Sequence, residues 1–122
     1  FSNISTLDYN GIYKGKYIEF DAKECKSKTS FPLSNIKSHQ IEHIEKILRH
    51  KGIIFLIIFM QNNFFLLKGE DLLNFIKNNS RKSIPYDYLT KVGYKIIEKY
   101  NPRLDYLKIV DDVYFKEAKW KK

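Results

Sequence analysis

The chain has 122 residues, 43% of them hydrophobic, so we expect a single domain over residues 1–122 with one core. The 22 Lys and Arg residues exceed the 14 Asp and Glu residues and give a net charge of +8, which favours an anionic partner such as nucleic acid. The lone Cys25 excludes an internal disulfide, and the longest apolar run, 53–60, is too short to cross a bilayer. We therefore expect a cytoplasmic protein without a membrane partner.

The first part of the chain is expected to be extended. Residues 1–6 predict a strand, and the Tyr-Asn-Gly sequence at 9–11 predicts a turn, because Asn-Gly tolerates positive φ. Residues 12–23 predict either a strand pair or one long strand interrupted near Gly15, since aromatic and β-branched residues favour β structure. A polar loop is expected over 24–33.

The middle of the chain predicts a helix followed by two strands. Apolar residues follow helical spacing over 38–50, and Gly52 is suited to end the helix. Residues 53–60 are continuously apolar and rich in Ile and Phe, which is typical of a central strand buried on both faces. The polar residues 61–63 predict a turn, and residues 64–67 predict a neighbouring strand.

The last part of the chain predicts mainly helices, at 70–78, at 85–92 after Pro85 and at about 107–114. The remaining segments are a polar, basic loop at 79–83, an ambiguous stretch at 94–104 and a mostly basic tail at 116–122. This order of elements predicts an α/β fold class, with a mixed sheet and helices on its faces.

Asp8, Asp21 and Lys23 are the most informative polar residues. Residues two apart share a face of a strand, so Asp21 and Lys23 point the same way, and a fold-back can bring Asp8 to them. Two carboxylates suit Mg²⁺, and an ammonium group beside them can stabilise charge on a phosphate under attack. The group predicts cleavage of phosphodiester bonds, and the alternative is a solvated strand end.

Several stretches of the chain carry a resemblance to a known family. They are residues 5–24 (STLDYNGIYKGKYIEFDAKE), 28–33 (KTSFPL), 39–43 (HQIEH), 93–94 (GY) and 102–106 (PRLDY). These stretches resemble the RecU family, the Holliday junction resolvases of Gram-positive bacteria and mycoplasmas. The resemblance implies a restriction-endonuclease-like fold, a homodimer, and cleavage of four-way junction DNA with Mg²⁺. We expect Mn²⁺ to be able to substitute for Mg²⁺.

The resemblance also implies roles for individual residues. Thr6, Asp8, Asp21 and Gln40 would surround the metal, and Lys23 would stabilise the transition state. The family usually has Glu where this chain has Asp21, so the metal must shift or a water must bridge the shorter side chain. The family also has an N-terminal segment, and we expect this chain to be a fragment that lacks it.

Two basic segments are candidate phosphate contacts. The residues concerned are Lys14, Lys16, Lys26 and Lys28 in the first segment and Arg81 and Lys82 in the second. An ordinary basic surface is the alternative for both segments. For the whole chain, the alternative to a nuclease is a non-catalytic basic DNA-binding module.

Residues 39–43 also match H-x-x-E-H, an inverted zinc-peptidase pattern. His39 and His43 would lie one helical turn apart and could share Zn²⁺, with Glu42 as the base. No third ligand is evident in the sequence. Two histidines on a solvent-facing or DNA-facing helix edge are therefore the favoured interpretation.

Overall fold

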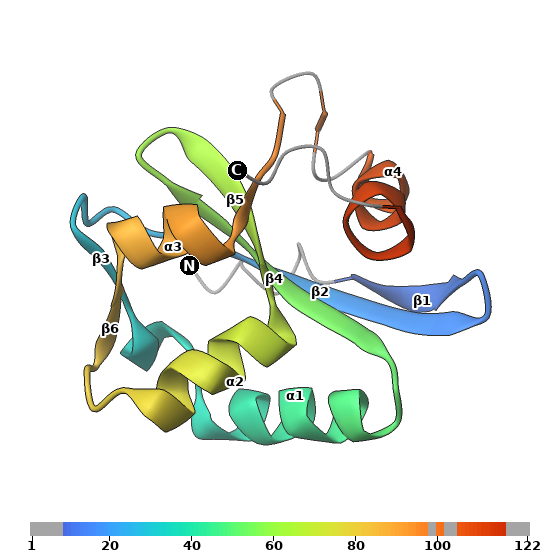
Figure 1. Cartoon of the computed structure of the whole chain (residues 1–122), viewed down its shortest axis with the longest axis horizontal. Helices are drawn as coiled ribbons and strands as arrows, with labels where there is room; N and C mark the ends of the chain where they lie inside the picture. Colours follow the sequence, from blue (N-terminus) through green and yellow to red (C-terminus); the bar gives the residue numbers. More distant parts are fainter. Residues whose placement is uncertain (1–8, 98–99, 102–104, 117–122) are drawn as a thin grey trace.

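The computed structural model describes residues 9–97, 100–101 and 105–116, and within them a mixed five-stranded sheet carries helices on both faces (Figure 1). Its strands, in spatial order, are β1 (Tyr9–Tyr13), β2 (Lys16–Glu24), β4 (Ile53–Met60), β5 (Asn63–Lys68) and β7 (Tyr94–Lys95). A two-stranded sheet pairs β3 (Ser30–Pro32) with β6 (Ser83–Pro85). The expected α/β class, a mixed sheet flanked by helices, is confirmed.

The helices divide between the two faces of the large sheet. Helices α1 (Ser38–Arg49), α2 (Gly69–Asn78) and α3 (Tyr86–Val92) contribute to the core on one face. On the other face, α4 (Tyr106–Val110) continues into a π-helical turn, η3 (Asp111–Phe115). A 3₁₀ turn, η2 (Leu33–Asn35), precedes α1. Within the described part, no helix is both long and apolar enough to span a membrane.

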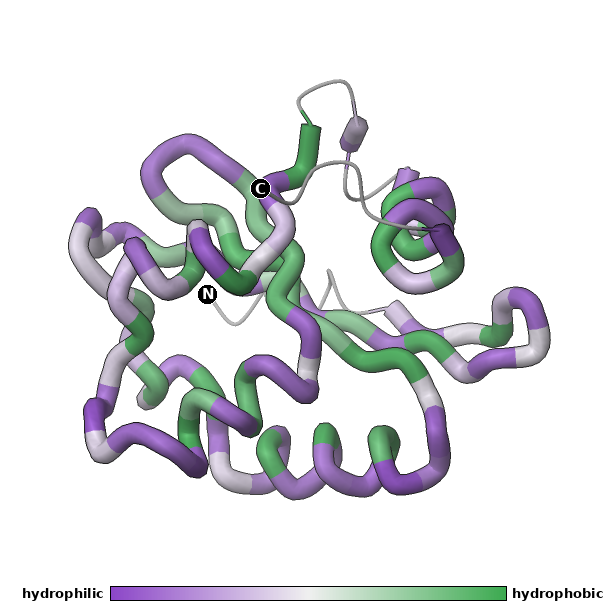
Figure 2. Tube along the Cα trace, in the orientation of Figure 1, coloured by the Kyte–Doolittle hydropathy of each residue, from purple (hydrophilic) through white to green (hydrophobic). Residues whose placement is uncertain are grey.

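Strand β4 is the centre of the fold, as its continuous apolar pattern predicts. It runs parallel to β2 and antiparallel to β5. Alternate residues face opposite sides of a strand, so Ile54, Leu56 and Ile58 enter the α1 side of the core and Phe55 and Ile57 enter the α4 side. Figure 2 shows hydrophobic residues along this strand and alternating hydrophobic and hydrophilic residues along α1.

The turn predicted at 9–11 is wrong. These residues belong to β1, and the chain turns at Lys14 (φ 53°) and Gly15 (φ 77°), so β1 and β2 form an antiparallel hairpin. Tyr9 packs against the α4 side of the core, and a Cβ at Gly11 would lie 2.5 Å from the Tyr9 hydroxyl. The absence of a Cβ at position 11 therefore leaves room for the Tyr9 side chain on the same face of β1.

Other differences concern short elements. The loops predicted at 24–33 and 79–83 contain β3 and the first residue of β6, which pair although they lie far apart in the sequence. The last helix is confirmed, with its second half as the π-helical turn. The strand predicted at 1–6 and the tail after residue 116 lie outside the described residues.

Candidate active site

One face of β2 carries three charged side chains, Glu19, Asp21 and Lys23, because every second residue of a strand points the same way. The alternate residues Ile18 and Phe20 enter the core on the α4 side of the sheet. Helix α1 contributes to the core of the other side. The charged face of β2 therefore meets α1 and is only partly open to solvent.

Asp21 and Lys23 form an ion pair at the centre of this face. Lys23 Nζ lies 2.9 Å from Asp21 Oδ2, and the two side chains are 9% and 17% exposed, respectively. A buried ammonium group is unfavourable without a counter-charge, so the Asp21 carboxylate compensates for the burial of Lys23. A positive and a negative charge therefore lie side by side on β2, from residues two positions apart.

Gln40 connects Asp21 to the beginning of α1. Its Nε2 donates a hydrogen bond to Asp21 Oδ2 at 3.4 Å, and its Oε1 accepts one from the Lys37 backbone N–H at 2.9 Å. The second bond satisfies an N–H group at the helix start. Asp21 Oδ1, in contrast, is buried and has no hydrogen-bond partner among the described residues. Such an oxygen is available to a ligand.

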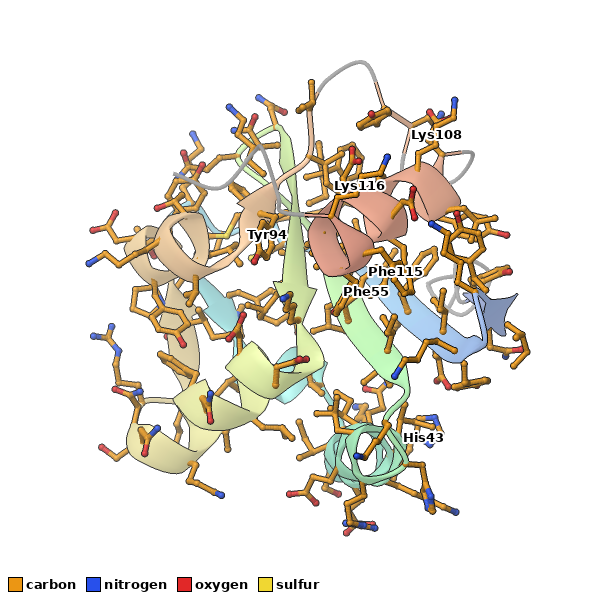
Figure 3. All side chains as sticks on the ribbon, turned by 45° about the vertical axis from the view of Figure 1, so that its right-hand side comes forward. His43, Phe55, Tyr94, Lys108, Phe115 and Lys116 are labelled. Carbon is orange, nitrogen blue, oxygen red and sulfur yellow. The ribbon has the colours of Figure 1, made fainter. Side chains whose placement is uncertain are left out.

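Glu19 is bound by two other side chains. His43 Nε2 lies 2.8 Å from Glu19 Oε1 and 2.9 Å from Oε2, and the Tyr17 hydroxyl donates to Oε1 at 2.6 Å. Burial is the larger cause, and the hydrogen bond to Glu19 the next, of a rise in the pKa of the Tyr17 hydroxyl to about 12. The hydroxyl therefore remains protonated and able to donate at neutral pH. Figure 3 shows His43 on α1, across the sheet from Phe115 at the end of the C-terminal helical segment, which consists of α4 and η3.

These residues border a cleft of about 130 Å³ between β2 and α1. Its lining consists of Glu19, Asp21, His39, Gln40 and His43 and the largely apolar set Phe20, Ile36, Ile44, Ile54, Phe55 and Leu56. Lys23 does not line the cleft and is joined to it through Asp21. The cleft is thus lined by carboxylate, amide and imidazole groups together with largely apolar side chains.

Among the described residues proposed for the magnesium site and catalysis, Asp21, Lys23 and Gln40 lie together. His39 and His43, which the zinc pattern singled out, line the same cleft as Asp21 and Gln40. Thr6 and Asp8 lie outside the described residues. Within the described ranges, no group of three or more His, Cys, Asp or Glu side chains is arranged to hold a metal ion. The zinc-peptidase pattern finds no support in this geometry, because His43 binds Glu19, and Glu42 is exposed and does not line the cleft.

The basic residues of the first segment have unequal surroundings. Lys14 forms an ion pair with Asp111, and its ammonium group lies over the rings of Tyr13 and Phe115. Lys14 therefore ties the β1–β2 turn to the C-terminal helical segment. Lys16 is exposed, and its Nζ donates a hydrogen bond of 3.4 Å to the carbonyl oxygen of Lys51.

The other candidate phosphate contacts are exposed. Lys26 and Lys28 lie in the loop after β2. Arg81 and Lys82 precede β6, and the Lys82 carbonyl oxygen accepts a hydrogen bond of 2.9 Å from Leu33 N–H. That bond places the second basic segment next to η2, the turn that leads into α1 and the cleft.

The sequence alone did not indicate that Glu19, His43 and Tyr17 form a network. A signal was present, since Glu19 is two residues before Asp21 on the strand and His43 is three residues after Gln40 on the helix. Both spacings keep side chains on the same face of their element. Only the packing of α1 on β2 shows that the two faces meet.

Comparison with known proteins identifies the family. A family model described as Recombination protein U (RecU) matches residues 1–112. The Holliday junction resolvase RecU of Bacillus licheniformis is 48% identical over 118 residues, which cover 94% of this chain and 60% of the relative. The protein of the same name from Bacillus subtilis (strain 168) is 47% identical over 118 residues, covering 94% and 57%, respectively.

The protein of that name from Staphylococcus aureus (strain JH9) is 48% identical over an alignment of 123 residues, and the match covers 97% of this chain and 59% of the relative. The chain thus spans 57–60% of the length of these three curated relatives. The five-stranded mixed sheet with helices on both faces is restriction-endonuclease-like, as the resemblance implied. The match of the family model over residues 1–112, together with this identity, shows that the chain belongs to the RecU family.

Proposed function

We propose that this chain is the nuclease part of a Mg²⁺-dependent endonuclease that resolves four-way (Holliday) DNA junctions in recombination and repair. Membership of the RecU family supports the activity, since the curated relatives are named Holliday junction resolvases. One structural observation supports the proposed metal site. Asp21 Oδ1 is buried without a hydrogen-bond partner among the described residues, and Asp21 lies beside Lys23 and Gln40.

The residues fit a magnesium ion. Mg²⁺ prefers oxygen ligands and is bound through one or two carboxylates, and Asp21 offers a carboxylate oxygen that has no hydrogen-bond partner among the residues the structure describes. The last described pair of the β1–β2 hairpin is Tyr9 with Phe20, and Asp8 directly precedes Tyr9 as Asp21 directly follows Phe20. We propose that Asp8 and Thr6 complete the ligand set with Asp21. Bound Mg²⁺ would neutralise charge on the scissile phosphate and activate a water molecule.

Gln40 would join this set through its amide oxygen. In the structure this oxygen caps α1 by accepting from Lys37 N–H, and the amide nitrogen faces Asp21. We propose that the amide group turns over when the ion is bound, so that Oε1 faces the metal. The cost is the two hydrogen bonds of this amide, one at the helix start and one to Asp21, at about 1 kcal/mol each.

Lys23 would stabilise charge that develops on the phosphate. Its ammonium group is held 2.9 Å from the proposed ligand Asp21, which would keep this positive charge close to the ion and to the phosphate bound there. Loss of one such stabilising group typically lowers the rate 100-fold or more, which corresponds to about 3 kcal/mol of barrier.

The basic surface would hold the DNA backbone. Lys16, Lys26, Lys28, Arg81 and Lys82 are exposed, and no ion pair within the described residues involves them. Lys14 contributes less in this proposal because Asp111 binds its ammonium group. Symmetric cleavage of a junction requires two active sites, so we also propose a homodimer, acting in the cytoplasm.

The test is cleavage of a synthetic four-way junction with Mg²⁺, with Mn²⁺ in parallel and a linear duplex as the control substrate. Asp21→Asn and Lys23→Ala should each lower the cleavage rate at least about 100-fold while leaving junction binding in place. Lys91→Ala, a change at an exposed lysine of α3 outside the cleft, is the matched control. Junction binding without cleavage by the wild type, unaffected by the metal, would instead identify a non-catalytic DNA-binding module.

A further inference from the structure

Two carboxylates of β2 line the same cleft but differ in their partners. Asp21 Oδ1 is buried with no hydrogen-bond partner among the described residues. Glu19, two residues earlier on the same face, has both oxygens bound by His43 and one of them also bound by Tyr17. A carboxylate has about four lone-pair positions, and three of those of Glu19 are in use.

The packing of α1 on β2 creates this difference. Gln40 contacts Asp21, and His43 contacts Glu19, so the helix runs antiparallel to the strand. Three helical residues advance about 4.5 Å and two strand residues about 6.6 Å, distances close enough for side chains to span. Ile44, which is 4% exposed, anchors this part of the helix in the core. One placement of the helix therefore sets both contacts.

Glu19 is a natural competitor for a cation at Asp21. It lies on the same face and has one more methylene group than Asp21, so its carboxylate can extend further along the cleft. Mg²⁺ normally retains several water molecules and takes few carboxylates, whereas each added carboxylate strengthens binding of a divalent cation. An additional carboxylate ligand would thus replace a water position and hold the ion more tightly.

We propose that His43 and Tyr17 are positioning residues that hold Glu19 out of the metal site, so that Asp21 is the only carboxylate of β2 that faces the ion. The inference rests on the proposed metal site and adds residues that determine its ligand set. The Tyr17 hydroxyl and the His43 imidazole occupy the oxygens that Glu19 would otherwise offer to the cation. Their function is to keep water positions at the ion free for the reaction.

The experiment measures binding of Mn²⁺ alone to the chain, from the electron paramagnetic resonance signal of the free ion. His43→Ala releases Glu19 and should tighten Mn²⁺ binding roughly tenfold. His43→Gln keeps a donor on a side chain of similar reach and should retain the wild-type affinity. In the His43→Ala background, Glu19→Gln should return the affinity to the wild-type value.

His39→Ala is the matched control, because His39 lines the same cleft one helical turn before His43 and forms no hydrogen bond with Glu19 in the described structure. Its Mn²⁺ affinity should equal that of the wild type. Tyr17→Phe removes a single hydroxyl group from the Glu19 network and should tighten binding in the same direction as His43→Ala. If His43→Ala fails to fold, Tyr17→Phe provides the test instead.

Two results overturn the inference while leaving the proposed function intact. One is an unchanged Mn²⁺ affinity in both His43→Ala and Tyr17→Phe. The other is tighter binding that Glu19→Gln does not reverse. A different result concerns the proposed function itself: if Asp21→Asn binds Mn²⁺ as the wild type does, the metal site at Asp21 is wrong, and the role of His43 and Tyr17 falls with it.

Discussion

Lys23 Nζ and Asp21 Oδ2 lie 2.9 Å apart on the same face of β2, and only 9% of the Lys23 side chain is exposed. The strand continues beside β4, the most buried strand of the sheet, so the pair is held on a rigid element. A buried ion pair contributes little net stability, but removing one partner leaves the other charge buried and uncompensated. The pair therefore has consequences for folding that are separate from its proposed chemistry.

Lys23→Met keeps the length of the side chain and removes its charge. We expect the free energy of unfolding to fall by about 3 kcal/mol, because the Asp21 carboxylate then lacks its counter-charge. Urea denaturation of this variant and of Lys23→Met/Asp21→Asn measures the effect, and the double variant should recover part of the loss. Glu24→Gln, at an exposed position of the same strand, is the control. Equal loss in the single and double variants would contradict the pairing.

The ion pair of Lys14 with Asp111 predicts the pH dependence of stability. The Lys14 ammonium group lowers the pKa of Asp111 below its ordinary value of 3.8. Because the folded state binds this proton less readily than the unfolded state, the stabilisation is complete above pH 3.8 and is lost as the pH falls through the lower, folded-state pKa.

We expect Asp111→Asn to reduce the acid dependence of Tm below pH 3.8 relative to the wild type. The bond to Asp111 also raises the pKa of Lys14 above 10.5, so this contribution persists below pH 10.5 and is lost as the pH rises through the folded-state pKa. Thermal unfolding across both pH ranges is the measurement.

Gly11 permits the packing of an aromatic cluster. The Tyr9 ring centroid lies 4.1 Å from that of Tyr106, and a Cβ at residue 11 would come 2.5 Å from the Tyr9 hydroxyl. Gly11→Ala should displace the ring and lower the free energy of unfolding by about 1–2 kcal/mol. Tyr9→Phe in the same chain removes the closest atom and should restore part of the stability. Denaturant titration distinguishes this result from a simple change in strand propensity, which Tyr9→Phe would not correct.

The basic segments predict different salt dependences of junction binding. Arg81→Ala and Lys82→Ala each remove an exposed cation near η2, so each should lower the slope of log affinity against log salt by about 0.9 if the residue contacts one phosphate. Lys14→Ala should change the slope less, because Asp111 binds the ammonium group. Fluorescence anisotropy with labelled junction DNA over a range of salt gives the slopes. An equal effect of all three substitutions would show that Lys14 leaves Asp111 to bind DNA.

Hydrophobic periodicity in the sequence was sufficient to identify the main elements. The apolar run at 53–60 predicts the strand that became β4, and the spacing over 38–50 predicts α1, because each pattern reports which faces of an element are buried. The alternation rule likewise predicts that Asp21 and Lys23 share a face, since it depends only on the strand itself. Gln40, in contrast, came from the family resemblance.

Tertiary structure decided which faces meet. The pairing of β3 with β6 and the contact of His43 with Glu19 join residues whose local sequence does not indicate the partner. The sequence does indicate an interruption near Gly15, and the structure shows that it is the turn of a strand pair rather than a break in one long strand. Periodicity identifies the buried side of a helix but not its register along a sheet. That register follows from packing the whole core at once. Here it leaves one oxygen of Asp21 without a hydrogen-bond partner in the described part of the chain, while both oxygens of Glu19 are bound.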